Sequence, residues 1–414
     1  MQARTDCCVV GGGPAGMMLA VLLARAGVSV TVLEKHDDFL RDFRGDTVHA
    51  STLTLLDELG LGERFSTIPH SVVQHLPVPL RSGRSLVVNF GLLPGPHKHI
   101  AMVPQWDLLE LLADAGRQEP SFTLRMGVEV TGLVREQGRV VGVRHRDAQG
   151  RDGELRAGVT VGCDGRTSAV RAASGLGIRD FGVPMDVLWF RLPRDEVELH
   201  GFGVWVGDDA VLVAIDRGSY FQLGYQIRKG SDARLRGEGI QAFRTRIVRL
   251  APPFANSIGA VRSWDDVKLL VVRLDRMPRW FCPGLLCIGD AAHAMSPVGG
   301  VGINLAIQDA VAAARYLATP LLRSGAVGQS DLARVQLRRW APTFVTQSLQ
   351  RLVHRLVLQP VLAGGRRPPA RRGPSRLAAA LRRFPGLQAI PAYVIGIGVL
   401  PEHAPSFARR SPSS

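Results

Sequence analysis

Residues 6–34, DCCVVGGGPAGMMLAVLLARAGVSVTVLE, decide the fold of this chain. An apolar strand over residues 6–10 leads into a GxGxxG turn at residues 11–16. A helix of small residues over 17–25 follows, and a β-branched strand over 28–33 ends in Glu34. The order strand, glycine-rich turn, helix, strand and acidic residue predicts a Rossmann-type dinucleotide-binding fold.

Each part of this stretch has a physical task. Gly11 permits the tight turn, Gly13 lets the backbone approach a pyrophosphate, and Gly16 lets the helix pack on the strand. The amides and dipole of the helix start favour phosphate. Glu34, at the end of the second strand, is placed to accept hydrogen bonds from the adenosine ribose hydroxyls.

The composition limits the protein class. The chain has 414 residues, of which 46% are hydrophobic and 21% charged, which predicts a large core and two interleaved domains. Its net charge of +15 comes almost wholly from arginine. Such a field attracts anions, for example a nicotinamide dinucleotide or an acidic substrate. The sequence has no nucleic-acid-binding motif, so no nucleic-acid partner is expected.

The five cysteines form no CxxC pair and no metal-binding spacing, so we expect no metal and a reducing, cytoplasmic location. Glycines and a proline interrupt the apolar run over 9–26, which therefore does not resemble a signal peptide. No uninterrupted apolar run is long enough to predict a transmembrane span.

The rest of the chain predicts a discontinuous arrangement. We expect a helix over 103–117, a β-meander between 122 and 163, a mostly antiparallel sheet over 182–227, a helix over 232–250, and strands over 269–274 and 285–288. No second GxGxxG and no redox cysteine pair follow, so the nicotinamide domain of disulfide-reductase flavoproteins is not expected.

The predicted fold class is α/β. A Rossmann-type dinucleotide-binding domain with a β-meander occupies residues 1–70, 101–178 and 280–340. It is interleaved with a mostly antiparallel β-sheet substrate domain over residues 71–100 and 179–279. A C-terminal helical region covers residues 341–414.

Two further motifs point to a family. Residues 162–171, GCDGRTSAVR, and 289–293, GDAAH, resemble the DG and GD motifs of single-component FAD-dependent aromatic hydroxylases of the para-hydroxybenzoate hydroxylase type. With the N-terminal turn they stand in the family's order, and the resemblance spans residues 6–314. It implies that the dinucleotide is FAD.

The cofactor site is predicted partly from residues and partly from the resemblance. Asp290 follows a buried strand, where an unpaired carboxylate is costly, and a ribityl chain would satisfy it. Amides at the helix start near residues 297–304 are expected to face the flavin pyrimidine and stabilise its reduced, anionic form. The resemblance implies that Arg44, with Arg41 as an alternative, and Gln105 contact FAD, and that Asp164 serves FAD placement and nicotinamide binding. The full predicted cofactor set is Gly11, Gly13, Pro14, Ala15, Gly16, Glu34, Lys35, Arg44, Gln105, Asp164, Gly165, Asp290, Gly300, Gly302, Ile303 and Asn304.

The resemblance also implies the chemistry. NAD(P)H reduces FAD, O2 adds at flavin C4a, and the hydroperoxide passes one oxygen to an aromatic or electron-rich small molecule, by hydroxylation or epoxidation. The flavin carries this reaction, so no catalytic side chain is assigned, with Pro297 and Arg44 as supporting residues. His293 is expected to be a packing residue rather than a base.

The substrate pocket is expected between the second sheet and the flavin. Strand alternation leaves open which side chains point inward, and core packing is an equal alternative for each aromatic one. The candidates are Trp189, Arg191, Tyr220, Gln222 and Tyr225. The sequence does not choose a substrate, a regiochemistry, NADH or NADPH, or an oligomeric state.

The C-terminal part offers three interpretations. Residues 338–362 predict an amphipathic helix, and residues 363–376 form a basic, proline-rich loop whose role the sequence leaves open. A helical appendage on the FAD domain is favoured over a cover for the substrate entrance or a peripheral membrane contact.

Rival functions remain. A reductase of the geranylgeranyl type would use the same FAD motifs, and a non-catalytic FAD protein could sequester a pathway intermediate. A flavin-dependent halogenase is not favoured, because its Trp-x-Trp-x-x-Ile-Pro motif is absent.

Overall fold

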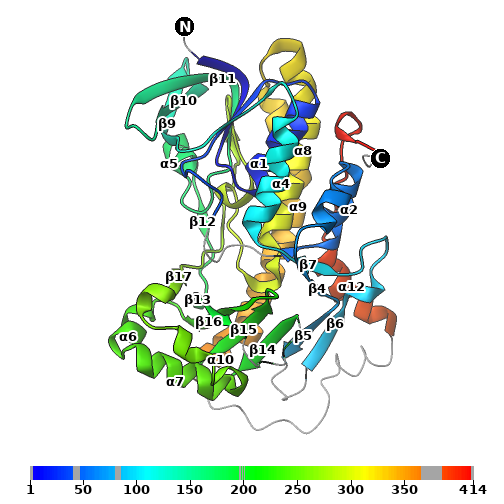
Figure 1. Ribbon diagram of the computed structural model, residues 1–414. Helices are drawn as coiled ribbons and strands as arrows, with labels where there is room; N and C mark the ends of the chain where they lie inside the picture. The colour runs from blue at the N-terminus through cyan, green and yellow to red at the C-terminus, as the bar shows by residue number, and fades with distance from the viewer. Residues whose placement is uncertain are drawn as a thin grey trace.

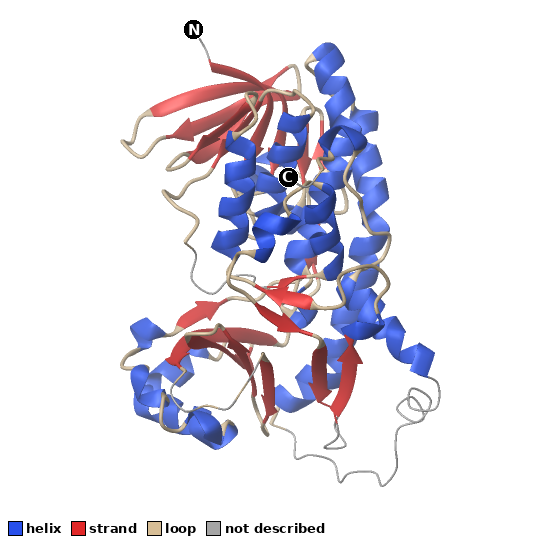
Figure 2. Ribbon diagram, turned by 45° about the vertical axis from the view of Figure 1, so that its right-hand side comes forward, coloured by secondary structure: helices blue, strands red, loops and turns tan. Residues whose placement is uncertain are grey.

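The computed structural model describes residues 3–40, 47–79, 85–194, 197, 199, 201–364 and 385–411. Strands gather in an upper and a lower group, and long helices lie along the upper group (Figures 1 and 2). This arrangement confirms the predicted α/β class with added antiparallel sheets.

The upper group is an eight-stranded sheet with the order β19-β20-β11-β1-β2-β8, and β10 and β9 continue from β11. Strands β20, β11, β1, β2 and β8 are mutually parallel. The bounds are β1 Ala3–Val10, β2 Val30–Leu33, β8 Phe122–Arg125, β9 Glu129–Glu136, β10 Arg139–Arg146, β11 Asp152–Gly162, β19 Phe281–Cys282 and β20 Leu285–Cys287. The antiparallel β9, β10 and β11 form the expected meander.

Register brings the three sequence motifs to one edge of this sheet. Val10 lies beside Leu33 of β2 and beside Gly162 of β11, which in turn lies beside Cys287 of β20. All four strands therefore end together. The GxGxxG turn, Glu34, the DG motif and the GD motif follow directly at these carboxyl ends, where parallel sheets bind ligands.

Helices cover the parallel sheet. Helix α1, Pro14–Arg25, packs against α4, Gln105–Arg117, and α8, Gly302–Ser324, and α9, Gln329–Val353, packs outside α8. Helix α1 is buried along almost its whole length, so its small and apolar residues form core rather than surface. The chain after α9 continues as a π-helical turn over His354–Leu358 and α10, Gln359–Leu362.

The lower group is a five-stranded antiparallel sheet with the order β14-β15-β16-β13-β17. Its strands are β13 Met185–Pro193, β14 Phe202–Val206, β15 Val211–Asp216, β16 Tyr220–Arg228 and β17 Lys268–Leu270. Helices α6, Asp232–Gly237, and α7, Ile240–Leu250, cover one face, and their core includes Phe190, Phe221 and Phe243.

Shorter elements connect these two groups. Sheet β3-β7-β4 is formed by Thr47–Val48, Ile100–Met102 and Ser71–Val73, and hairpin β5-β6 by His75–Pro79 and Ser85–Asn89. Strands β12, Arg179–Asp180, and β18, Asp275–Arg276, form a two-stranded ladder. The remaining helices are α2 Ala50–Glu58, α3 Gly62–Ser66, α5 Ala169–Ser174 and α12 Pro385–Gly396.

Several predicted bounds were wrong. The predicted helix over 232–250 is two helices, because Gly239 has φ +86° and interrupts the ladder. The strand predicted over 269–274 ends at Leu270, and the helix predicted over 338–362 begins at Gln329. Residues 365–384, which include most of the basic loop, lie outside the described residues.

Candidate active site: a dinucleotide cradle joined to an apolar chamber

The GxGxxG turn closes on the DG motif. Gly11 has φ +102°, and a Cβ there would lie 2.6 Å from the Cys163 carbonyl oxygen. A Cβ on Gly16 would collide with the Gly11 carbonyl, so this glycine sets the contact between helix and strand. A Cβ on Gly13 would meet no protein atom within 4 Å, because this glycine faces the cavity.

The start of α1 is not capped by a side chain in the part of the chain that the structure describes. Gly13 is its N-cap and gives no side-chain hydrogen bond, and Pro14 occupies the first turn. A helix start without a capping side chain leaves amides for an anion, and a pyrophosphate fits this requirement. Pro14 and Ala15 line the cavity beside it.

Glu34 is held at the end of β2 by backbone amides. Its Oε2 accepts from the Gly12 amide at 2.8 Å and its Oε1 from the His36 amide at 3.1 Å. The side chain is buried at the cavity wall, and Lys35 lines the same end. The two amide bonds fix the orientation of the carboxylate at the cavity wall, and the ribose contact of Glu34 stays a prediction.

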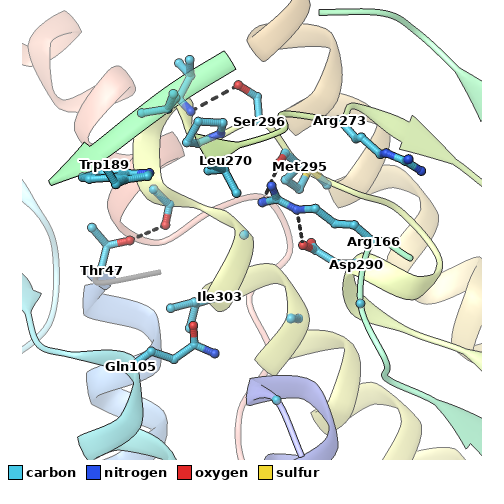
Figure 3. Close-up of a pocket in the computed structure, with 18 of the residues that line it drawn as sticks. Thr47, Gln105, Arg166, Trp189, Leu270, Arg273, Asp290, Met295, Ser296 and Ile303 are labelled. Carbon is cyan, nitrogen blue, oxygen red and sulfur yellow. Dashed lines mark hydrogen bonds and ion pairs between the residues drawn. The ribbon is translucent and has the colours of Figure 1, made fainter. Parts of the chain in front are cut away.

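Asp290 has a partner that the sequence reasoning missed. Arg166 donates from Nε to Asp290 Oδ2 at 2.9 Å and from Nη2 to the Met295 carbonyl at 3.4 Å (Figure 3). The Asp290 carboxylate therefore already has a partner within the protein, and this ion pair joins the DG motif to the GD motif. Among the described residues, Arg166 Nη1 is buried without a hydrogen-bond partner, and both side chains line the cavity. A polar ligand with hydroxyl oxygens fits this unmet donor and the other carboxylate oxygen.

Asp164 organises the DG motif. Its carboxylate accepts from the Ser168 hydroxyl at 2.5 Å and from the Val170 amide at 3.1 Å, at the start of α5. Burial raises the pKa of this carboxyl group, and the hydrogen bonds oppose that rise. Asp164 and Gly165 line the cavity, so the predicted role in cofactor placement is compatible with a side chain already bonded to its own loop.

The start of α8 forms the opposite wall. Gly299 and Gly300 have φ +82° and +63°, and the Thr47 hydroxyl donates to the Gly300 carbonyl at 2.5 Å. A Cβ on Gly300 would meet that Thr47 side chain. The first turn of α8 carries no capping side chain. The predicted residues that line the cavity here are Pro297, Gly300, Gly302 and Ile303.

The side chain of Asn304, a member of the predicted cofactor set, is engaged within the protein. It is buried outside the cavity wall, and its Oδ1 accepts from the His49 amide at 2.9 Å and the Thr52 hydroxyl at 2.7 Å. Its side chain therefore joins α8 to the start of α2. Gln105 lines the cavity at the start of α4, and its contact with FAD stays a prediction, whereas Arg44 and Arg41 lie outside the described residues.

We call the site between the GxGxxG turn, the DG and GD motifs and the start of α8 the cradle. It opens directly into a second, apolar part of the same cavity, which we call the chamber. One cavity of about 1580 Å³ runs from the GxGxxG turn to the lower sheet. This exceeds the roughly 300–1,000 Å³ of an ordinary ligand pocket and gives room for a cofactor and a second molecule. The chamber is walled by apolar side chains, including Val73, Met102, Val187, Phe202, Val204, Val211, Val213, Ile215, Leu270, Val357 and Val361.

The predicted substrate residues lie in different places on the lower sheet. Trp189 lines the chamber, and its ring lies over Gly224, where a Cβ would come within 2.9 Å of it (Figure 3). Arg191, Tyr220 and Gln222 fall on the same face but do not line the cavity, and Arg191 lies 5.0 Å from the Tyr220 ring.

Tyr225, a candidate for which core packing was an equal alternative, is a core residue. It lies on the opposite face of the sheet and packs against Phe243 at 5.8 Å. The sequence reasoning also missed the inward-facing Val211, Val213 and Ile215 of β15. Their signal is the apolar run VLVAI, which is typical of a strand buried on both faces.

His293 is a buried structural residue, as expected. Its Nε2 lies 2.5 Å from Asp309 Oδ2, and its ring packs on Trp280 at 4.8 Å. Burial alone would raise the pKa of Asp309, but His293 and Arg339 outweigh it and hold that pKa below its usual value. Within the described part of the chain, no cluster of His, Cys, Asp and Glu could hold a metal, and no helix is long and apolar enough to cross a membrane.

Comparison with known proteins agrees with this geometry. The model of the FAD-binding domain family matches residues 4–336. The chain is 36% identical over 361 residues to a 6-methylpretetramide 4-monooxygenase from Streptomyces rimosus, covering 86% of this chain and 85% of the relative. It is 27% identical to a 3-demethoxyubiquinol 3-hydroxylase from Escherichia coli K12, covering 83% and 88%.

A solved structure supports the fold. An anhydrotetracycline hydroxylase from Streptomyces rimosus superposes with a TM-score of 0.74 at 23% identity, covering 95% of this chain and 76% of that one. The cradle, the family match over most of the chain and the 36% identical relative lead to one conclusion. This chain belongs to the FAD-binding family of single-component aromatic hydroxylases and is an FAD-dependent monooxygenase.

Proposed function

We propose that the protein uses NAD(P)H and O2 to insert one oxygen atom into a flat, extended aromatic small molecule that enters the apolar chamber. The observation that carries this proposal is the single cavity that joins the dinucleotide cradle to the inner face of the lower sheet. The relative named 6-methylpretetramide 4-monooxygenase supports a fused-ring substrate.

The side chains have three tasks in this proposal. FAD, when bound, supplies the redox chemistry with NAD(P)H and O2. The chamber wall excludes water by means of closely spaced valines from β13, β14 and β15, and Trp189 presents a flat ring to an aromatic substrate. The uncapped starts of α1 and α8 hold the anionic parts of the cofactor, and Arg166 fixes Asp290 beside it.

The rival functions make different demands. A reductase of the geranylgeranyl type would need a chamber for a long aliphatic chain, and it would not consume O2. A non-catalytic FAD protein would oxidise no NAD(P)H. The relatives named as monooxygenases and hydroxylases do not favour either alternative.

The fate of oxygen decides between them. The purified protein, loaded with FAD, is offered 18O2, NADH or NADPH, and a panel of phenols, quinones and polyketide-like aromatics that includes 6-methylpretetramide. We expect a product with one labelled oxygen and NAD(P)H consumption in proportion to it. An unlabelled, saturated product that forms equally well without O2 would establish the reductase instead.

The domain division and the compartment are also proposals. Dividing the chain into a discontinuous FAD domain, a substrate domain and a C-terminal helical region is supported by the two separate sheet cores. A cytoplasmic location is supported by five cysteines in the free thiol form. Burial raises the pKa of the Cys7 and Cys163 thiols, which keeps them protonated and unreactive.

A further inference from the structure

A concentration of arginine lies on the ladder between the two sheets, outside the cavity wall. Arg179 of β12 and Arg276 of β18 stand directly opposite each other across the two strands. Arg351 of α9 approaches the same place, and all three guanidinium carbons lie within 5.5 Å of the Phe181 ring centroid. Like charges directly opposite each other destabilise a strand pair, so an anion bound here would offset their repulsion.

The nearby acidic residues of the ladder, Asp180 and Asp275, form no ion pair with these arginines in the part of the chain that the structure describes. Within the described residues, no ion pair joins Arg179, Arg276 or Arg351 to a carboxylate. The neighbouring carboxylates are used elsewhere: Asp275 lies 3.5 Å from Arg171 and accepts the Ala294 amide, and Asp180 accepts the Gly182 amide. Burial, Arg179 and Arg351 together lower the pKa of Arg276, and no carboxylate opposes them.

Two exposed aromatic rings border the arginines. Trp340 and Phe344 of α9 stack with centroids 5.0 Å apart and an interplanar angle of 11°, and each is about two-fifths exposed. Arg276 lies 5.4 and 5.2 Å from these two rings. We call the set Arg179, Phe181, Arg276, Trp340, Phe344 and Arg351 the arginine–aromatic patch. Exposed aromatic rings stack nucleobases, and guanidinium groups bind phosphates.

The patch is close to the rim of the cavity. Arg273 lines the cavity and precedes Arg276 by three residues, a separation of roughly 10 Å along an extended chain. Val353, two residues after Arg351 on α9, also lines it. Arg273 extends from the side of the cavity that holds Arg166 and Asp290 (Figure 3). An extended dinucleotide is long enough to connect the patch with the cavity.

We propose that the arginine–aromatic patch binds the adenosine diphosphate part of the reduced nicotinamide dinucleotide while its nicotinamide enters the cavity. This inference rests on the proposed use of NAD(P)H. It explains how a chain with one Rossmann turn, which FAD occupies, engages a second dinucleotide. The site is a positively charged surface, so the encounter is brief and depends on salt.

The test compares Arg276→Gln and Arg351→Gln, which lie on different elements, with Arg249→Gln. Arg249 is an exposed arginine on α7, on the side of the lower sheet away from the chamber, and its substitution removes the same charge. Anaerobic stopped-flow reduction of bound FAD is followed with NADH and with NADPH. We expect the apparent Kd to rise about tenfold in both patch variants, as for a lost charge-assisted hydrogen bond, with the limiting rate retained.

Two further measurements complete the test. The Kd for ADP, measured by calorimetry, should rise in the patch variants, and their Kd for NAD(P)H should depend less on salt concentration. Arg249→Gln should change the Kd for ADP and this salt dependence by less than twofold. Equal behaviour of all three variants would overturn the proposal. Loss of binding to phosphatidylglycerol vesicles with an unchanged Kd for NAD(P)H would also overturn it, because the patch would then be a membrane contact.

Failure of this inference can be distinguished from failure of the proposed function. Enzyme whose FAD is photoreduced, without any nicotinamide, is mixed with O2 and substrate. The patch variants should then form as much hydroxylated product as the unmodified protein. Absence of product from the unmodified protein as well would count against the monooxygenase activity and not against the patch alone.

Discussion

At the scale of single residues, the glycines of the GxGxxG turn have two different roles, which the sequence pattern does not distinguish. Gly11 has a positive φ and touches the Cys163 carbonyl, whereas Gly13 has ordinary backbone angles and faces open space. The first glycine is therefore needed by the protein fold, and the second by the ligand.

Alanine substitutions should show this difference. Gly11→Ala should lower the free energy of unfolding of the FAD-free protein by about 1–3 kcal/mol, because the turn is strained and overpacked. Gly13→Ala should leave that stability within about 0.5 kcal/mol but weaken FAD binding, because the methyl group occupies the approach to the pyrophosphate. Urea unfolding and fluorescence titration of FAD measure the two effects. Equal loss of stability in both variants would contradict the assignment of Gly13.

His49 makes stability depend on pH. Burial lowers its pKa to about 4, because its Nε2 is buried without a hydrogen-bond partner among the described residues, and the hydrogen bond from Nδ1 to the Ile395 carbonyl only partly opposes this shift. The unfolded chain binds a proton near pH 6.5, and the folded chain binds it only near pH 4. The stabilisation is complete above pH 6.5 and is lost as pH falls toward 4, by up to about 3 kcal/mol.

This pH dependence can be measured by difference. His354 is also buried, and its pKa is likewise lowered to about 4, so the unmodified protein loses stability from both groups. His49→Gln should reduce the drop in unfolding free energy between pH 7 and pH 5 and leave the His354 contribution. An unchanged drop would show that His49 does not titrate with a lowered pKa in the folded protein.

At the scale of elements, β15 and β16 show how one sheet serves both a core and a chamber. Val213 points into the cavity, whereas Tyr225 on the adjacent strand points toward α7. Residues on neighbouring strands thus belong to different environments, because successive side chains alternate between the two faces.

Substitutions on the two faces should have different effects. Val213→Phe should fill part of the chamber, lower kcat/KM for the aromatic substrate by roughly tenfold, and leave FAD retention unchanged. Tyr225→Phe removes only a hydroxyl group on the far face and should leave kcat/KM within about twofold. Steady-state product formation with each variant measures this. A larger effect of Tyr225→Phe than of Val213→Phe would contradict the assigned orientation of the sheet.

At the scale of the whole molecule, a buried charge network ties the C-terminal segment to the FAD-binding part. Arg339 of α9 is fully buried and donates to Asp309 of α8 at 3.0 Å and to the Leu400 carbonyl at 3.2 Å. Glu402 lies 3.6 Å from it and also accepts from Arg338. The chain after α12 therefore returns to the outer side of α8.

Neighbouring arginines provide a matched test of this network. Arg339→Ala should lower the free energy of unfolding by about 3–5 kcal/mol, because it leaves buried carboxylates without their partner. Arg338→Ala removes a partly exposed side chain that contacts the same Glu402, and should cost less than about 1 kcal/mol. Chemical denaturation measures both. Similar values for the two variants would show that burial of the network contributes little.

The sequence by itself determined the class of fold, the cofactor and the three motifs at the cradle. These features are local: a strand, a turn with required glycines and a helix start are specified by neighbouring residues, and the strand order brings their ends together. The prediction of a structural His293 also needed only its place after the GD pair.

Only the tertiary structure decided which side chains face the ligand. Asn304 was chosen for its place in a helix start, but a distant loop at His49 occupies its hydrogen bonds. Asp290 was expected to be satisfied by a ribityl chain, but Arg166, 124 residues away along the chain, already donates to it. The orientation of Tyr225 could not be predicted, because apolar residues occupy both faces of its strand. Hydrogen bonds and packing between distant segments depend on how sheets and helices come together, and no local pattern specifies those contacts.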